Sequence, residues 1–166
     1  MGVKNKPNSL SAEEAQSRLE HQCSMREMCI SQVRQKLYRW GVSPDDSNKI
    51  IQYLLANRYV DDNRFAKAFA RDKFRFDKWG PSKIRMHLKA KGIDAAIIND
   101  AISLVEDDAL PDAVIREIKR KYKTIKAKNT YERKMKVTAF GVRKGFDYEL
   151  VKSCVDAVSV ELNSSE

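Results

Sequence analysis

Three short segments of this chain share one pattern around a glycine. Residues 36–42 read KLYRWGV, residues 87–93 read HLKAKGI, and residues 136–142 read KVTAFGV. In each segment an aliphatic residue stands four positions before the glycine, and another follows the glycine directly. A helix that ends at a left-handed glycine, with the next apolar residue folding back onto its last turn, produces this pattern. We therefore expect Gly41, Gly92 and Gly141 each to end a helix.

The spacing of these glycines indicates a repeat. They are separated by 51 and then 49 residues, and an aliphatic residue also stands ten positions after each of them. A period of this size is typical of stacked helical units. Helix-start signals predict three helices in each unit, and no segment keeps the apolar–polar alternation of a strand. These signals are Ser11 with Glu14, Ser43-Pro44, Asp61, Gly80-Pro81, Asp94, Pro111-Asp112, Thr130 and the stretch near Lys144. The sequence predicts an all-α fold built as a tandem array of three three-helix repeats.

The predicted organisation has five parts. These are a disordered N-terminal tail over 1–9, helical repeats over 10–60, 61–108 and 109–162, and a C-terminal tail over 163–166. No apolar run approaches the roughly 20 residues that a membrane span needs. The first ten residues lack the apolar core of a signal peptide, and the three cysteines are too few for a disulfide framework. We expect a cytoplasmic protein without contact to a membrane.

The positive charge of the chain is concentrated in two blocks. The formal net charge of the 166 residues is +9. Residues 61–91 carry ten cations and four anions, residues 111–136 carry ten and three, and residues 92–110 between them carry five anions and no cation. Such blocks indicate an electrostatic partner, such as nucleic acid or an acidic protein. Solvated helix faces with a basic bias would give the same composition, so charge alone leaves both interpretations open.

The predicted helix over 62–78 has two contrasting faces. At 100° per residue, Phe65, Phe69 and Phe76 lie on one face, where we expect core packing. Phe74 lies at the border, as a core-edge residue or a stacking aromatic. Five cations lie together on the opposite face: Arg64, Lys67, Arg71, Arg75 and Lys78.

The same two faces return 49 residues later. Lys67 and Arg71 correspond to Arg116 and Arg120, and Lys123 extends the second basic stripe. A solvated face needs no particular sign of charge, so the matched cations favour a binding surface. Arginine and lysine suit phosphates and carboxylates alike, so the stripes do not name the partner. The candidate surface comprises Arg64, Lys67, Arg71, Arg75, Lys78, Arg116, Arg120 and Lys123.

Catalytic and metal-binding interpretations find little support in the sequence. His21, Cys23 and Cys29 match the spacing of no common zinc site and lack a fourth ligand, so buried thiols explain the cysteines better. Asp61 and Asp62 are adjacent at a helix start, where a capping role accounts for them. There is no phosphate-binding loop, dinucleotide fingerprint or nucleophile elbow. We expect a protein that is not an enzyme and that needs no metal or cofactor.

One stretch points to a known family. Residues 59–66, which read YVDDNRFA, together with Arg71, Gly80, Ile84, Leu88 and 91–93, strongly resemble the signature of the RecX family, the bacterial regulators of the recombinase RecA. The match is dense over 53–102. The resemblance implies a curved, elongated array of three-helix repeats that is not an enzyme. It also implies binding along the groove of the RecA–DNA filament and inhibition of the ATPase, strand-exchange and coprotease functions of RecA. We expect a monomer that binds single- and double-stranded DNA weakly and without sequence preference.

A stand-alone, nonspecific DNA-binding helical module is the alternative function. A helix-turn-helix reader of DNA sequence needs Asn, Gln, Ser or Arg at the exposed start of its recognition helix. The helices after Gly41 and Gly92 begin instead with Pro44-Asp45-Asp46 and Asp94-Ala95-Ala96. These starts disfavour sequence-specific reading and leave nonspecific binding to phosphates open.

Overall fold

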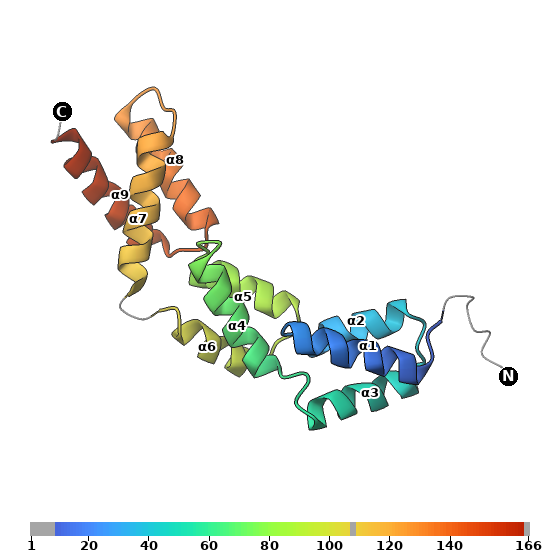
Figure 1. Ribbon diagram of the computed structural model, residues 1–166. Coiled ribbons are helices and arrows are strands. Elements are labelled where there is room, and N and C mark those ends of the chain that lie inside the picture. Colours follow the sequence, from blue (N-terminus) through green and yellow to red (C-terminus); the bar gives the residue numbers. More distant parts are fainter. Residues whose placement is uncertain (1–8, 107–108, 165–166) are drawn as a thin grey trace.

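The computed structural model describes residues 9–106 and 109–164, which form nine α-helices and no strand (Figure 1). The helices are α1 (Ala12–Met25), α2 (Ile30–Arg39), α3 (Pro44–Ala56), α4 (Asp62–Arg75), α5 (Pro81–Ala90), α6 (Ala95–Ser103), α7 (Ala109–Thr124), α8 (Thr130–Arg143) and α9 (Tyr148–Asn163). Except for Ser9, the tail predicted over 1–9 lies outside the described residues. In the predicted C-terminal tail, Asn163 still belongs to α9 and Ser164 caps it.

The helices pack in three consecutive groups of three. Every extensive helix–helix contact lies within α1–α3, α4–α6 or α7–α9. Each group has its own apolar core, with Leu19 and Leu54 in the first, Ile84 and Leu88 in the second, and Ile118 and Val151 in the third. The groups follow one another along an elongated, curved molecule, with α1–α3 at one end and α7–α9 at the other (Figure 1). The predicted all-α array of three three-helix repeats is confirmed.

Most helix starts follow from local capping chemistry. Ser11 and Glu14 form the expected capping box, in which each side chain accepts a hydrogen bond from the other residue's backbone N–H at 3.1 Å. Asp94 caps α6 by accepting from the N–H of Ala96 at 2.8 Å. The predicted start at Pro111 is wrong, since α7 already begins at Ala109. The first turn of a helix tolerates proline because its N–H groups have no intrahelical acceptor.

Two of the three predicted helix-ending glycines are confirmed. Gly41 has φ of 70° and Gly92 has φ of 72°, both in the left-handed region. The residue after each one folds back as expected: the N–H of Val42 donates to the carbonyl of Leu37 at 3.1 Å. The equivalent bond from Ile93 closes the end of α5.

The prediction for Gly141 is wrong. Gly141 lies inside α8, and the left-handed residue that ends this helix is Gly145, with φ of 93°. The last helix accordingly starts at Tyr148, beyond the start expected near Lys144. The α8 helix has 14 residues where α5 has 10, which adds about one turn. Residues four apart share a helix face. The sequence pattern around Gly141 therefore resembles that of a helix end, although the left-handed glycine comes one turn later.

Phe76, the third phenylalanine expected on the core face of the predicted helix, is also misplaced by the sequence argument. Phe65 is buried and Phe69 is half-buried, as expected, but Phe76 is 69% exposed. Phe76 lies just past the end of α4 at Arg75, and neither the second nor the third apolar core includes its side chain. Phe74 packs against both the second and the third core, which confirms its predicted place at a core edge.

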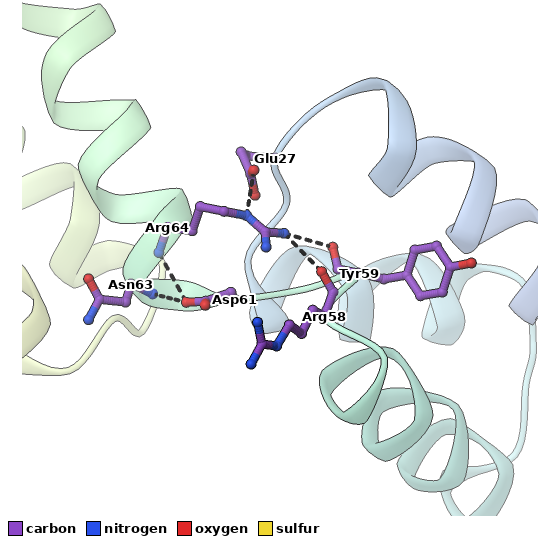
Figure 2. A network of polar contacts seen from close by, with 6 residues as sticks. All are labelled: Glu27, Arg58, Tyr59, Asp61, Asn63 and Arg64. Atoms are coloured by element: carbon purple, nitrogen blue, oxygen red, sulfur yellow. Dashed lines mark hydrogen bonds and ion pairs between the residues drawn. The ribbon is translucent and has the colours of Figure 1, made fainter.

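The junction between the first two repeats is a network of polar contacts (Figure 2). The Arg64 guanidinium donates through Nε to Glu27 Oε1 at 2.6 Å, and through Nη2 to the carbonyls of Arg58 and Tyr59 at 3.1 and 3.4 Å. The hydrogen bond to Glu27 raises the pKa of Arg64 above its ordinary value. Arg64 on α4 therefore ties its own repeat to the loop before α2 and to the chain leaving α3.

The two adjacent aspartates cap two different helices. Asp61 accepts from the N–H groups of Asn63 and Arg64 at 2.9 and 3.0 Å, and so caps α4. Asp62 Oδ1 accepts from the N–H of Ile30 at 2.9 Å, and so satisfies the start of α2 in the preceding repeat. Helix capping therefore accounts for both aspartates, and the hydrogen bond from Ile30 to Asp62 holds the first repeat against the second.

Arg64→Ala is expected to destabilise the fold, whereas Arg71→Ala is not. The first change removes three hydrogen bonds. It also leaves the negative charge of Glu27 without its cationic partner, and the Oε2 atom of Glu27 is already buried without a hydrogen-bond partner. The Arg64 side chain is 42% exposed, so solvent screening limits the expected loss to about 1–2 kcal/mol. Urea unfolding of both variants measures the difference. Equal stability of the two would mean that the junction does not depend on Arg64.

Candidate functional site

A groove lies between α4 and α7, where the second repeat meets the third. It has a volume of about 310 Å³. Four exposed cations line it, with Arg71, Arg75 and Lys78 from α4 and the turn after it, and Arg116 from α7. Its remaining lining is Phe74, Leu104, Val105, Ala113 and Glu117. We call this site, defined by its four cations, the basic groove. It brings three cations of the first predicted basic stripe together with Arg116 of the second.

The geometry of α4 and a left-handed turn after it place three cations of the second repeat in the lining of the basic groove. Arg71 and Arg75 are one turn apart on α4 and so share a face. Lys78 lies three residues past the end of that helix, with φ of 57°, and its Nζ donates to the carbonyl of Arg75 at 2.6 Å. A lysine that binds a carbonyl at the C-terminal end of a helix is also stabilised by the negative end of the helix dipole.

The one carboxylate among the described residues that line the groove is already paired. Glu117 is 9% exposed, and its Oε2 accepts from Arg120 Nη2 at 3.0 Å. Over residues 9–106 and 109–164, Arg71 and Arg116 have no hydrogen-bond or ion-pair partner. The basic groove therefore holds a surplus of positive charge that its own side chains do not neutralise.

The other predicted site residues lie outside the groove lining. Lys67 is half-buried on α4, two turns before Arg75. Arg120 is held by Glu117, and Lys123 is exposed near the end of α7. Arg64 belongs to the junction between the first two repeats.

Sequence reasoning missed the apolar part of the groove. Leu104 and Val105 follow α6 and line the site, with Leu104 47% exposed. In the sequence they look like the end of an ordinary core helix. Their place in a groove depends on where α7 docks, and no local pattern encodes that.

Backbone contacts set the position of α7 relative to α4. The N–H of Gly80 donates to the carbonyl of Lys144 at 2.6 Å, and the N–H of Ser82 donates to the carbonyl of Gly145 at 3.1 Å. The start of α5 thus meets the end of α8, so unpaired donors of one helix satisfy unpaired acceptors of another. Lys144 Nζ also donates to the carbonyl of Asp77 at 3.0 Å. This junction holds the third repeat on the second and keeps the basic groove in shape.

Aromatic and cationic side chains cover the same junction. The Nζ atoms of Lys73 and Lys83 lie 4.8 and 4.3 Å from the ring centroid of Trp79, within the range of cation–π attraction. The hydrogen bond from Lys73 lowers the pKa of Asp77, and the charges of Lys144 and Lys83 add to the effect. Asp77 is therefore an anion at neutral pH and offsets part of this local charge.

The described part of the chain assembles no metal-binding group. Over residues 9–106 and 109–164, no three His, Cys, Asp or Glu side chains lie close enough to hold an ion. Cys29 is buried in the second core, Cys154 is buried in the third, and Cys23 is half-buried. None of the described helices is long and apolar enough to cross a membrane.

The fold and the groove together define a class: all-α proteins of tandem three-helix repeats with a basic groove between two repeats. Residues 61–102 match the family described as "RecX, second three-helix domain", and residues 111–155 match "RecX, third three-helix domain". The chain belongs to the RecX family, as the signature in residues 59–66 predicted.

Curated relatives carry the same family name. The chain is 33% identical over 140 residues to the regulatory protein RecX of Lactobacillus johnsonii, covering 80% of this chain and 49% of the relative. It is 31% identical over 145 residues to that of Lactobacillus gasseri, covering 82% and 51%. The chain thus spans about half the length of these relatives.

Solved structures share the fold. A crystal structure of a regulatory protein RecX superposes with a TM-score of 0.79 at 23% identity, covering 87% of this chain and 71% of the other. A crystal structure of RecX from Lactobacillus salivarius superposes with a TM-score of 0.78 at 19% identity, covering 90% and 97%. At such identities the likeness concerns the fold.

Proposed function

We propose that this chain binds the RecA–DNA filament and inhibits the recombinase, ATPase and coprotease activities of RecA in the cytoplasm. Membership of a family whose relatives are named regulatory proteins supports a regulatory role. The observation that carries the proposal is the basic groove, because its four cations lie on the second and third repeats, within the segments that match RecX domains. A filament of protein and nucleic acid offers such a groove both phosphates and carboxylates.

The proposed mechanism is binding without chemistry. A regulator that catalyses nothing can shift its target only by binding one state of that target more tightly than another. The planar guanidinium groups of Arg71, Arg75 and Arg116 suit two-point contacts with phosphate or carboxylate oxygens. Lys67 and Lys123 flank this centre and add long-range attraction, whereas Arg120 neutralises the carboxylate of Glu117. Arg64 acts in this proposal by positioning the second repeat.

The direct test is the hydrolysis of ATP by RecA on single-stranded DNA with increasing amounts of this protein. We expect the rate to fall as the protein saturates the filament, while the protein alone hydrolyses neither ATP nor DNA. An unchanged rate at saturating protein would overturn the proposal. Turnover that co-purifies with the protein and disappears on a point substitution would show that it is an enzyme.

A stand-alone DNA-binding module is the second candidate, because the basic groove could hold phosphates without RecA. The third helix of each repeat has an acidic start, with Asp45 and Asp46 in α3, Asp94 before α6, and Asp147 before α9. These carboxylates would repel the phosphates beside a base-reading helix, so any binding should be independent of sequence. Affinity for bare DNA equal to that for the filament would favour this candidate.

A further inference from the structure

The third repeat carries an apolar groove between α8 and α9, on a surface distinct from the basic groove. Its volume is about 420 Å³. Tyr131, Met135, Val142 and Tyr148 are 74%, 56%, 42% and 52% exposed. The apolar lining consists of Tyr131, Met135, Ala139, Val142, Tyr148 and Val155. Large apolar side chains gathered at a groove, rather than scattered singly, mark a binding surface.

In each of the first two repeats a polar bridge joins the equivalent pair of helices. Arg34 Nη1 donates to Asn48 Oδ1 at 3.3 Å across α2 and α3. Arg85 Nη1 donates to Asn99 Oδ1 at 2.6 Å across α5 and α6. Both residues of the second pair lie 51 positions after those of the first, so the bridge belongs to the repeat.

The third repeat lacks this bridge. Gly92 and Gly145 end equivalent helices and are 53 residues apart, so the same offset aligns the surfaces. Thr138 then stands in place of the arginine and Lys152 in place of the asparagine, and both line the groove. Met135 likewise replaces a serine found at this position in both other repeats. The third repeat therefore differs from the other two repeats at three positions that line its apolar groove.

The length of the groove indicates a helical occupant. Its lining runs along α8 from Tyr131 to Val142, which spans about 17 Å at the rise of an α-helix. That length accommodates about three turns of a second helix, with apolar side chains at every third or fourth position.

The charges at the edge of the apolar groove determine which sign of charge the occupant should carry. Lys134 Nζ pairs with Asp156 Oδ1 at 2.8 Å. Lys152 lines the groove and has no ion-pair partner within residues 9–106 and 109–164. Two lysines against one aspartate leave a net positive edge, which favours acidic side chains on the occupant.

We propose that the apolar groove binds an amphipathic helix of a partner protein, with acidic residues beside its apolar face. The proposal goes beyond the function assigned to the basic groove and does not depend on it. Substitution of the cations of the basic groove should leave this binding unchanged, so the failure of one proposal does not entail failure of the other.

The probe is a fluorescein-labelled synthetic helix of about four turns, with leucine at every third or fourth position and glutamate between. A second peptide carries lysine in place of glutamate. We expect fluorescence anisotropy to show saturable binding of the acidic peptide, at least about tenfold tighter than that of the basic one. Absence of binding, or equal binding of both peptides, would overturn the proposal.

The structure suggests a variant that closes the groove without changing net charge. Thr138→Arg with Lys152→Asn installs the arginine–asparagine bridge of the other two repeats. We expect it to keep the parent's circular dichroism spectrum and to bind the acidic peptide at least about tenfold more weakly. Met86→Gln is the matched control, because it also leaves the net charge unchanged and Met86 is 60% exposed on α5 at the position equivalent to Ala139. Equal loss in both variants would contradict the proposal.

A second copy of this chain is the competing occupant. Sedimentation velocity over a range of concentrations distinguishes the two cases. We expect a monomer for the parent and for the bridged variant alike. Self-association of the parent that disappears in the bridged variant would make the groove an interface between copies, and would overturn the proposal.

Discussion

Gly80→Ala is expected to undock the third repeat from the second. A Cβ atom at this position would lie 2.3 Å from both the carbonyl carbon and the oxygen of Gly145, and 2.5 Å from the backbone nitrogen of Phe146. These neighbours are backbone atoms, so no side-chain rotation can relieve the clash. The hydrogen bond from Gly80 to Lys144 would be lost as the repeats separate. We expect a loss of about 3 kcal/mol or more in the stability of the third repeat.

Gly92→Ala is the matched control for this clash. Gly92 also follows a helix end, but no heavy atom lies within 4 Å of a Cβ built there. Its φ of 72° alone should cost about 1 kcal/mol. Urea unfolding followed by tryptophan fluorescence suits the comparison, because Trp79 packs beside the affected junction. Equal destabilisation by both substitutions would show that the junction yields and that only the backbone conformation matters.

Replacing the four cations of the basic groove by glutamine is expected to abolish most filament binding while leaving the fold intact. Arg71, Arg75, Lys78 and Arg116 are all exposed, so their charges contribute little to folding. We expect a nearly unchanged melting temperature. Affinity for the RecA–DNA filament should fall by at least about tenfold, or 1.4 kcal/mol. The difference should be larger at low salt, because added salt screens the attraction that the four charges supply.

A second quadruple variant controls for total charge. Arg18, Arg39, Lys89 and Arg143 are exposed and lie outside the basic groove. Their replacement by glutamine changes the net charge equally, so it should reduce long-range attraction but not the specific contact. If both variants lose affinity to the same extent, net charge rather than the groove drives binding. If the groove variant inhibits RecA as well as the parent does, the four cations are not the contact.

Much of the fold could be predicted from the sequence because its signals act over a few residues. The capping box of Ser11 and Glu14, the cap by Asp61 and the left-handed Gly41 each depend on groups within four positions along the chain. The basic stripe of α4 was visible for the same reason, since helical periodicity alone places Arg71 and Arg75 on one face. The family signature lies in one continuous stretch, residues 59–66.

Only the tertiary structure decided which of these features meet. The sequence by itself determined an all-α chain of three-helix repeats, its family and its two basic stripes. It did not reveal that Gly145 rather than Gly141 ends α8, because one extra turn preserves the face and hides the shift. It did not show that Arg64 and Arg71 have different roles: Glu27 holds Arg64 at the junction of two repeats, whereas Arg71 lines the basic groove. Those outcomes depend on contacts between residues far apart in the chain, and the docking of whole repeats creates them.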